Sequence, residues 1–93
     1  MGKKNKSTKE TFPHFRHYKK SGHPALITAE YSETEYNYRK VMHSEKDGKR
    51  NNEKVYPNPN PKDDKPMYIG KRVKHDSKKF FGKVPYPWKY PKK

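Results

Sequence analysis

The chain has 93 residues, a formal net charge of +14 and no Cys. This length allows one small domain at most and excludes a large enzyme with a deep pocket. No apolar run approaches the roughly 20 residues of a membrane-spanning helix, and the lack of Cys excludes disulfides and thiolate metal sites, so we expect a cytoplasmic protein without a membrane partner.

The chain begins with a strongly basic segment. Residues 1–11 contain four Lys and, after Met1, no apolar side chain that a core could bury. We therefore predict a disordered basic arm over residues 1–11, a folded domain over residues 12–83, and a basic tail rich in Pro and aromatic residues over residues 84–93.

The middle of the chain contains the two best strand candidates. Pro24 to Tyr31 is short and apolar, and Tyr36 to His43 is rich in aromatic and β-branched residues. The five residues from Ser32 to Tyr36 have the length of a hairpin connection. Alternation along the second strand places its Tyr side chains on one face, and Arg39 and Val41 on the other.

The second half of the chain predicts three further elements. Residues 54–56 and 67–73 are typical of strands, and the three prolines between them favour a stiff, extended loop. Residues 76–82 indicate one helical turn, which Asp76 caps and Gly82 ends in the left-handed conformation.

Together these elements favour an all-β fold, a small and strongly bent antiparallel β-barrel with one short helical turn. Only 27% of the residues are hydrophobic, so a disordered basic chain that folds on a partner is the alternative. The aromatic content of 14% favours the folded domain, because rings bury much area on few rotatable bonds.

The charge indicates a polyanionic partner, and basic residues alternate with aromatic ones in several places. Such a pattern suits RNA or single-stranded DNA, because bases stack on exposed rings while phosphates meet Lys. The alternative is that the rings fill a thin core. The predicted nucleic-acid-binding residues are Arg16, Tyr18, Lys19, Lys20, Tyr38, Arg39, Lys40, Arg72, Lys79, Phe80, Trp88 and Lys89.

Cleavage of RNA without a cofactor needs a base, an acid and a cation around one phosphate. His23 precedes the first predicted strand and His43 ends the second, so antiparallel pairing brings both to one edge of the sheet. Arg39 lies on the strand face of His43 and is the candidate cation. The alternative is that both His are exposed strand ends without a catalytic role.

We expect no metal and no cofactor. The five His lack a Cys or an acidic cluster that would complete a metal site, and no glycine-rich phosphate-binding motif is present.

The order of the segments over residues 22–83 resembles the MazF/PemK-like toxin family. Gly22 to Ile27 is similar to that family's Arg-Pro segment with its following aliphatic strand, and Val41 to Ser44 is similar to its next strand, which ends in Thr-Ser or Ser-Ser. The later segments that follow in the family's order are Lys65 to Ile69, Arg72 with Val73, and Lys79 to Gly82.

The resemblance implies an SH3-like β-barrel, usually a homodimer, that cleaves RNA without a cofactor and is inhibited by an acidic antitoxin. The family's catalytic Arg corresponds to His23, and its catalytic Thr or Ser corresponds to His43 or Ser44. The family's N-terminal strand is replaced here by basic residues 1–20.

We therefore predict a small basic module that binds RNA or single-stranded DNA, with endoribonuclease activity as a further possibility. One alternative is an inhibitor from a mobile element or phage that binds a nucleoprotein or a nucleic-acid-processing enzyme. Another is a structural ribosome-associated or nucleoid protein. The chain is also similar to short basic proteins of bacterial mobile elements.

Overall fold

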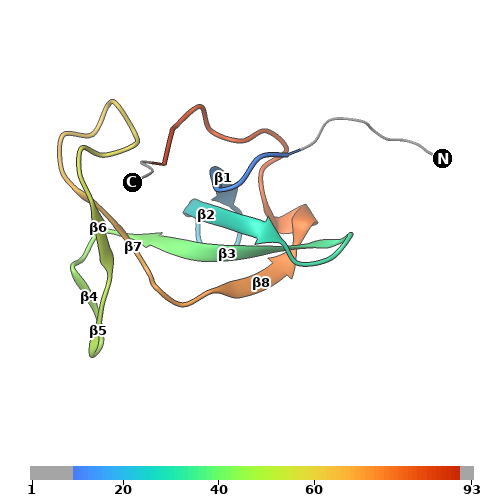
Figure 1. The fold of residues 1–93 in the computed structure, drawn as a ribbon, viewed down its shortest axis with the longest axis horizontal. Helices are drawn as coiled ribbons and strands as arrows, with labels where there is room; N and C mark the ends of the chain where they lie inside the picture. Colours follow the sequence, from blue (N-terminus) through green and yellow to red (C-terminus); the bar gives the residue numbers. More distant parts are fainter. Residues whose placement is uncertain (1–9, 91–93) are drawn as a thin grey trace.

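The computed structural model describes residues 10–90 and shows an antiparallel, mostly β-strand protein (Figure 1). The predicted all-β class is therefore confirmed. The predicted arm falls largely on residues 1–9, outside the described residues. The elements are β1 (His14–Tyr18), β2 (His23–Glu30), β3 (Glu35–Met42), β4 (Lys46–Asp47), β5 (Arg50–Asn51), β6 (Glu53–Val55), β7 (Met67–Ile69), β8 (Lys74–Ser77) and the 3₁₀ turn η2 (Lys78–Phe80).

The long strand β3 organises the main sheet. One edge of β3 pairs with β2, and β2 pairs in turn with β1. The other edge pairs with β8 along the first half of β3 and with β7 near its end, and β7 continues to β6. Strands β4 and β5 form a separate small hairpin. Strands β7 and β8 thus both pair with β3, and the connection between them runs away from β3 and back to it (Figure 1).

Residues 80–82, which follow β8, return to β1. The amide of Lys19 donates to the Phe80 carbonyl at 2.7 Å, and the amide of Gly82 donates to the His17 carbonyl at 2.8 Å. These bonds, together with an antiparallel bridge between Tyr18 and Phe81, join this segment to β1.

Both faces of the sheet carry a core cluster, and both are rich in aromatic residues. The first cluster contains Tyr18, Ala25, Ile27, Tyr36, Tyr38 and Phe81. The second contains Phe15, Leu26, Val55, Met67 and Ile69, and it packs against Val41, Tyr86, Trp88 and Tyr90. The rings therefore compensate for the small number of aliphatic residues, and the C-terminal tail is part of the fold.

Several local predictions are wrong. The helical turn is only η2, and it begins after Ser77, because Asp76 belongs to β8. Positive φ occurs at Gly22 and Gly48 but not at Gly82, which instead pairs with β1. The strand predicted over residues 67–73 ends at Ile69, since the chain then crosses to β8.

Candidate nucleic-acid interface

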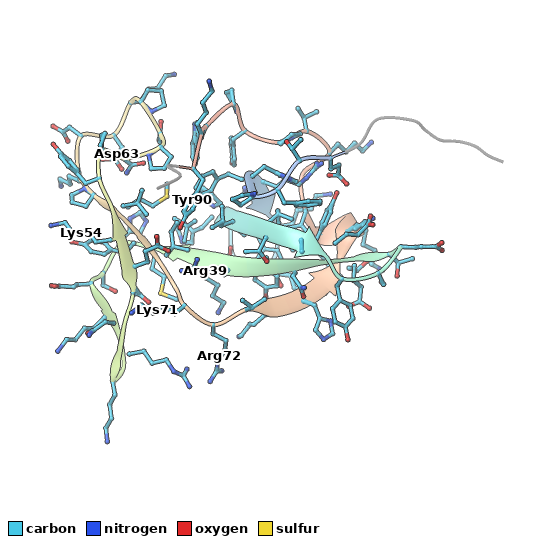
Figure 2. The ribbon with its side chains drawn as sticks, in the orientation of Figure 1. Arg39, Lys54, Asp63, Lys71, Arg72 and Tyr90 are labelled. Carbon is cyan, nitrogen blue, oxygen red and sulfur yellow. The ribbon has the colours of Figure 1, made fainter. Side chains whose placement is uncertain are left out.

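Five basic side chains line one cleft beside β3, and we call it the basic cleft. They are Lys40, Arg50, Lys71, Arg72 and Lys74. Among the side chains that the structure describes, no acid lines the cleft, and none of the five bases forms an ion pair. Figure 2 shows Lys71 and Arg72 on the connection between β7 and β8, with Arg72 extending away from the ribbon. The cleft therefore concentrates positive charge that no acid of the described chain neutralises.

The cleft forms where the edge of β3 changes partner from β8 to β7. At that point the amide of Gly70 donates to the Lys40 carbonyl at 2.8 Å, and Arg39 Nε donates to the Gly70 carbonyl at 2.7 Å. A Cβ atom at Gly70 would lie 3.2 Å from Met42 Cε and 3.7 Å from the Lys40 oxygen. Only the flexible end of the Met42 side chain would be tight against this atom, so the two hydrogen bonds at Gly70 are what hold the basic connection against β3.

Arg39 supports this connection from inside the protein. Its Nη2 donates to Glu53 Oε1 at 2.8 Å, and the Tyr90 hydroxyl donates to Glu53 Oε2 at 2.6 Å. Burial and the bond to Glu53 raise the pKa of Tyr90 above its ordinary value. The sequence predicted that Arg39 contacts phosphate, but the structure places its guanidinium in an internal hydrogen-bond network, with the side chain only 16% exposed.

His23 and His43 lie at one edge of the sheet, as the predicted antiparallel pairing requires. Their ring centroids are 5.5 Å apart, with an interplanar angle of 80°. They line a cavity of about 290 Å³ with Lys40, which also lines the basic cleft. Arg39 does not line this cavity, so the cation beside the histidines is Lys40. The Ser44 hydroxyl donates to the Lys46 carbonyl at 3.0 Å.

Three of the predicted nucleic-acid-binding residues are buried. Tyr18 and Tyr38 are core residues, 6% and 4% exposed, and Arg16 is 8% exposed. A base cannot stack on a ring that the core covers, so the predicted stacking role of Tyr18 and Tyr38 is wrong. Trp88 is half-buried and stacks on Tyr86 with ring centroids 4.3 Å apart.

The remaining predicted bases are exposed, and they lie outside the basic cleft. Lys20 pairs with Asp76 at 3.0 Å and lies over the Phe80 ring, and Lys79 lies over the same ring. Lys19 and Lys89 are exposed. Sequence reasoning missed Arg50, Lys71 and Lys74 as cleft residues. The run Lys71-Arg72-Val73-Lys74 was a visible signal, whereas nothing local in the sequence links Arg50 to it.

Comparisons with protein-family models, with curated proteins and with solved structures found no match to this chain. No helix among residues 10–90 has the length and apolar character that crossing a membrane requires. In the same residues, no group of three or more His, Asp or Glu side chains is arranged to hold a metal ion. The fold and the cleft define a small basic all-β protein.

Proposed function

We propose that this protein binds RNA or single-stranded DNA through the basic cleft. The observation that carries the proposal is the convergence of five bases in one cleft, with no acid among its described lining residues. Phosphates that bind there release the counterions condensed on the nucleic acid, and this release favours binding at low salt. Lys40, held in β3, and the connection anchored at Gly70 give the cleft a defined shape.

The test compares two triple variants that lose the same charge. The cleft variant carries Lys71→Gln, Arg72→Gln and Lys74→Gln. The control variant carries Lys54→Gln, Lys62→Gln and Lys65→Gln, at exposed lysines outside the cleft.

Fluorescence anisotropy with a labelled single strand measures affinity against salt. If the five cleft bases each neutralise one phosphate, wild-type affinity falls about a hundredfold between about 50 and 200 mM salt. The slope of log affinity against log salt becomes shallower by about 2 in the cleft variant and is unchanged in the control variant. Absence of wild-type binding at low salt, or equal losses in both variants, contradicts the proposal.

We further propose RNA cleavage at the His23–His43 pair as a second candidate function. The observation that favours it is that Lys40 lines both the histidine cavity and the basic cleft. One His would take the proton of the 2′-hydroxyl while its oxygen attacks phosphorus. The other His would protonate the departing 5′-oxygen, and Lys40 would stabilise the charge of the transition state. The products are a 2′,3′-cyclic phosphate and a 5′-hydroxyl.

The assay incubates a mixed single-stranded RNA with purified protein in chelator. We expect cleavage with a bell-shaped pH profile that His23→Ala and His43→Ala both abolish while RNA binding persists. His75→Ala is the control, because His75 pairs with Glu35 at 2.7 Å and does not line the cavity. Equal cleavage by all variants, or none by the wild type, leaves a binding protein only.

A further inference from the structure

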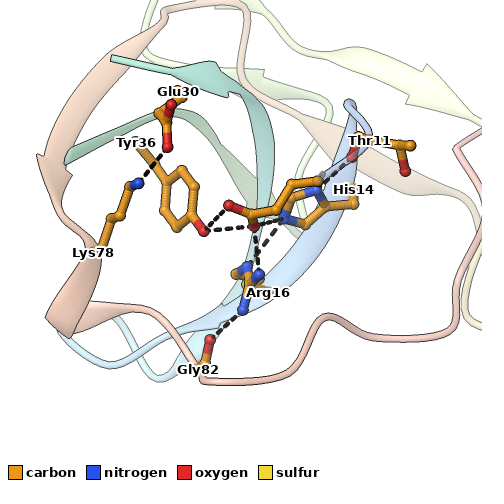
Figure 3. Close-up of polar contacts among 8 residues, drawn as sticks. Thr11, His14, Arg16, Glu30, Tyr36, Lys78 and Gly82 are labelled. Carbon is orange, nitrogen blue, oxygen red and sulfur yellow. Dashed lines mark hydrogen bonds and ion pairs between the residues drawn. The ribbon is translucent and has the colours of Figure 1, made fainter. Parts of the chain in front are cut away.

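A second basic recess lies on the side of the sheet formed by β1, the start of β3 and η2. It has a volume of about 860 Å³, and Figure 3 shows the polar contacts at its base. The side chains at the base are Glu10, His14, Arg16 and Tyr36. Four lysines also line it, namely Lys19, Lys78, Lys79 and Lys83. None of the basic-cleft residues lines this recess, so the two sites are separate.

The guanidinium of Arg16 is fixed at the base of the recess by two protein acceptors. Its Nη1 donates to the Gly82 carbonyl at 2.7 Å, and its Nε donates to His14 Nε2 at 3.0 Å. His14 Nδ1 lies 2.8 Å from the Thr11 carbonyl, so Nδ1 carries the ring proton and Nε2 is free to accept. Burial lowers the pKa of His14, which agrees with this neutral form. The 3.9 Å approach of His14 to Glu10 is therefore not a charged pair.

The third side of the guanidinium is directed at a carboxylate. Arg16 Nη2 donates to Glu10 Oε1 at 2.6 Å, and the Tyr36 hydroxyl lies 2.6 Å and 2.8 Å from the two Glu10 oxygens. Burial acts to raise the pKa of Glu10, but the bonds from Tyr36 and Arg16 outweigh it and hold the pKa below its ordinary value. The base of the recess thus stabilises an anion.

The buried guanidinium of Arg16 also favours an anion at the base of the recess. Removing the partner of a buried charge leaves that charge uncompensated, which is strongly unfavourable. Arg16 is 8% exposed, so an anion that takes the place of Glu10 keeps the charge of Arg16 compensated. The rim suits an anion of higher charge than a carboxylate. Lys78 pairs with Glu30 and lies over the Tyr36 ring, but within residues 10–90 Lys19, Lys79 and Lys83 form no ion pair.

We propose that this recess is a binding site for a phosphate group, and that Glu10 occupies it in the free protein. Arg16 and Tyr36 bind the phosphate oxygens, and the unpaired rim lysines balance its second charge. Binding displaces Glu10, which is exposed. The volume of the recess also admits a nucleotide, so the phosphate can come from a free phosphate or from the end of a nucleic acid.

The test titrates inorganic phosphate into wild type, Glu10→Gln and Glu33→Gln at constant ionic strength. Binding is followed by NMR at the Arg16 side-chain Nε–Hε resonance. Glu33 is exposed and forms no ion pair in the described chain, so Glu33→Gln matches the charge change alone. We expect Glu10→Gln to bind phosphate about 10- to 100-fold more tightly than the other two proteins, because displacing Glu10 breaks charge-assisted hydrogen bonds.

Two further arms identify the source of the phosphate. A nucleoside 5′-monophosphate is compared with its nucleoside, and a 5′-phosphorylated oligonucleotide with its 5′-hydroxyl form. Preference for the phosphorylated oligonucleotide at the Arg16 resonance assigns the site to nucleic-acid ends, and equal response of the two oligonucleotides assigns it to free phosphates and nucleotides.

Equal phosphate affinity in all three proteins, or shifts confined to the basic cleft, would overturn the proposal. If Glu10→Gln does not fold, the phosphate affinities of the wild type and of the rim variant Lys83→Gln are compared instead. The proposal requires that the rim variant binds phosphate more weakly than the wild type, and equal affinities would overturn it. The triple variant of the basic cleft must retain this phosphate binding, so failure at the recess and failure at the cleft are distinguishable.

Discussion

Replacing Arg39 with Gln tests whether this side chain supports the fold from inside or contacts phosphate. In the structure its guanidinium holds Gly70 and Glu53, so the substitution removes one bond to a carbonyl and one to a carboxylate. A bond to a charged group contributes about 1.5–3 kcal/mol, and a neutral one about 1 kcal/mol. Glu53 is 34% exposed, so solvent screening reduces the ionic part. We expect the free energy of unfolding to fall by about 2–3 kcal/mol.

Arg72→Gln is the matched control, because Arg72 is exposed and lines the basic cleft. Urea unfolding should show a change within about 0.5 kcal/mol for this variant. Its salt slope for single-strand binding should become shallower by about 0.7, whereas the slope of Arg39→Gln should equal that of the wild type. Unchanged stability in Arg39→Gln together with a shallower slope would refute the internal role and restore the phosphate contact that the sequence predicted.

Further predictions concern stability. Tyr18→Phe keeps the ring but removes the hydroxyl that donates to Asp76 at 2.5 Å and accepts from Tyr38 at 3.2 Å, so urea unfolding at neutral pH should show a loss of about 2–3 kcal/mol. Tyr56→Phe is the control and should leave the free energy of unfolding unchanged, since Tyr56 is 65% exposed. Burial acts to raise the pKa of Asp76, but the bonds from Tyr18 and from other donors hold this pKa below its ordinary value of 3.8. The stabilisation by this bond is therefore present above pH 3.8 and is lost as the pH falls through the lower pKa of the folded protein. A Tyr18→Phe effect that persists undiminished in acid contradicts this assignment. Ile69→Ala leaves a cavity at a fully buried position, so the free energy of unfolding should fall by about 2–5 kcal/mol, measured by thermal or urea unfolding. A fall of less than about 1 kcal/mol would show that the second core cluster is not tightly packed.

The two central strands were predictable to within a residue or so at each end. Strands β2 and β3 contain the apolar run and the aromatic run that the sequence separates by a hairpin length, and the alternation on β3 places its Tyr and Val side chains in different core clusters. The edge location of His23 and His43 followed from the same antiparallel pairing. These features are local, because a strand and its hairpin partner are close in sequence.

The strands β1 and β8 were not predictable in the same way. Strand β1 contains His14, Arg16 and His17, a pattern typical of a solvated segment, and Arg16 is buried only because Glu10 and the Gly82 carbonyl receive its donors. Strand β8 is polar and is held by backbone pairing to β3, with Asn37 opposite His75. Their strand conformation depends on partners that the local pattern does not contain.

By itself, the sequence determined the excess of positive charge, the scarcity of aliphatic residues and therefore the use of rings in the core. Only the tertiary structure decided which charges are neutralised. Arg16 and Arg39 are enclosed and paired, whereas Lys71 and Arg72 remain free and meet Lys40 in one cleft. The physical reason is that Coulomb interaction depends on separation in space. Folding joins Arg39 to Glu53 across 14 residues, and it places no acid among the described residues that line the basic cleft.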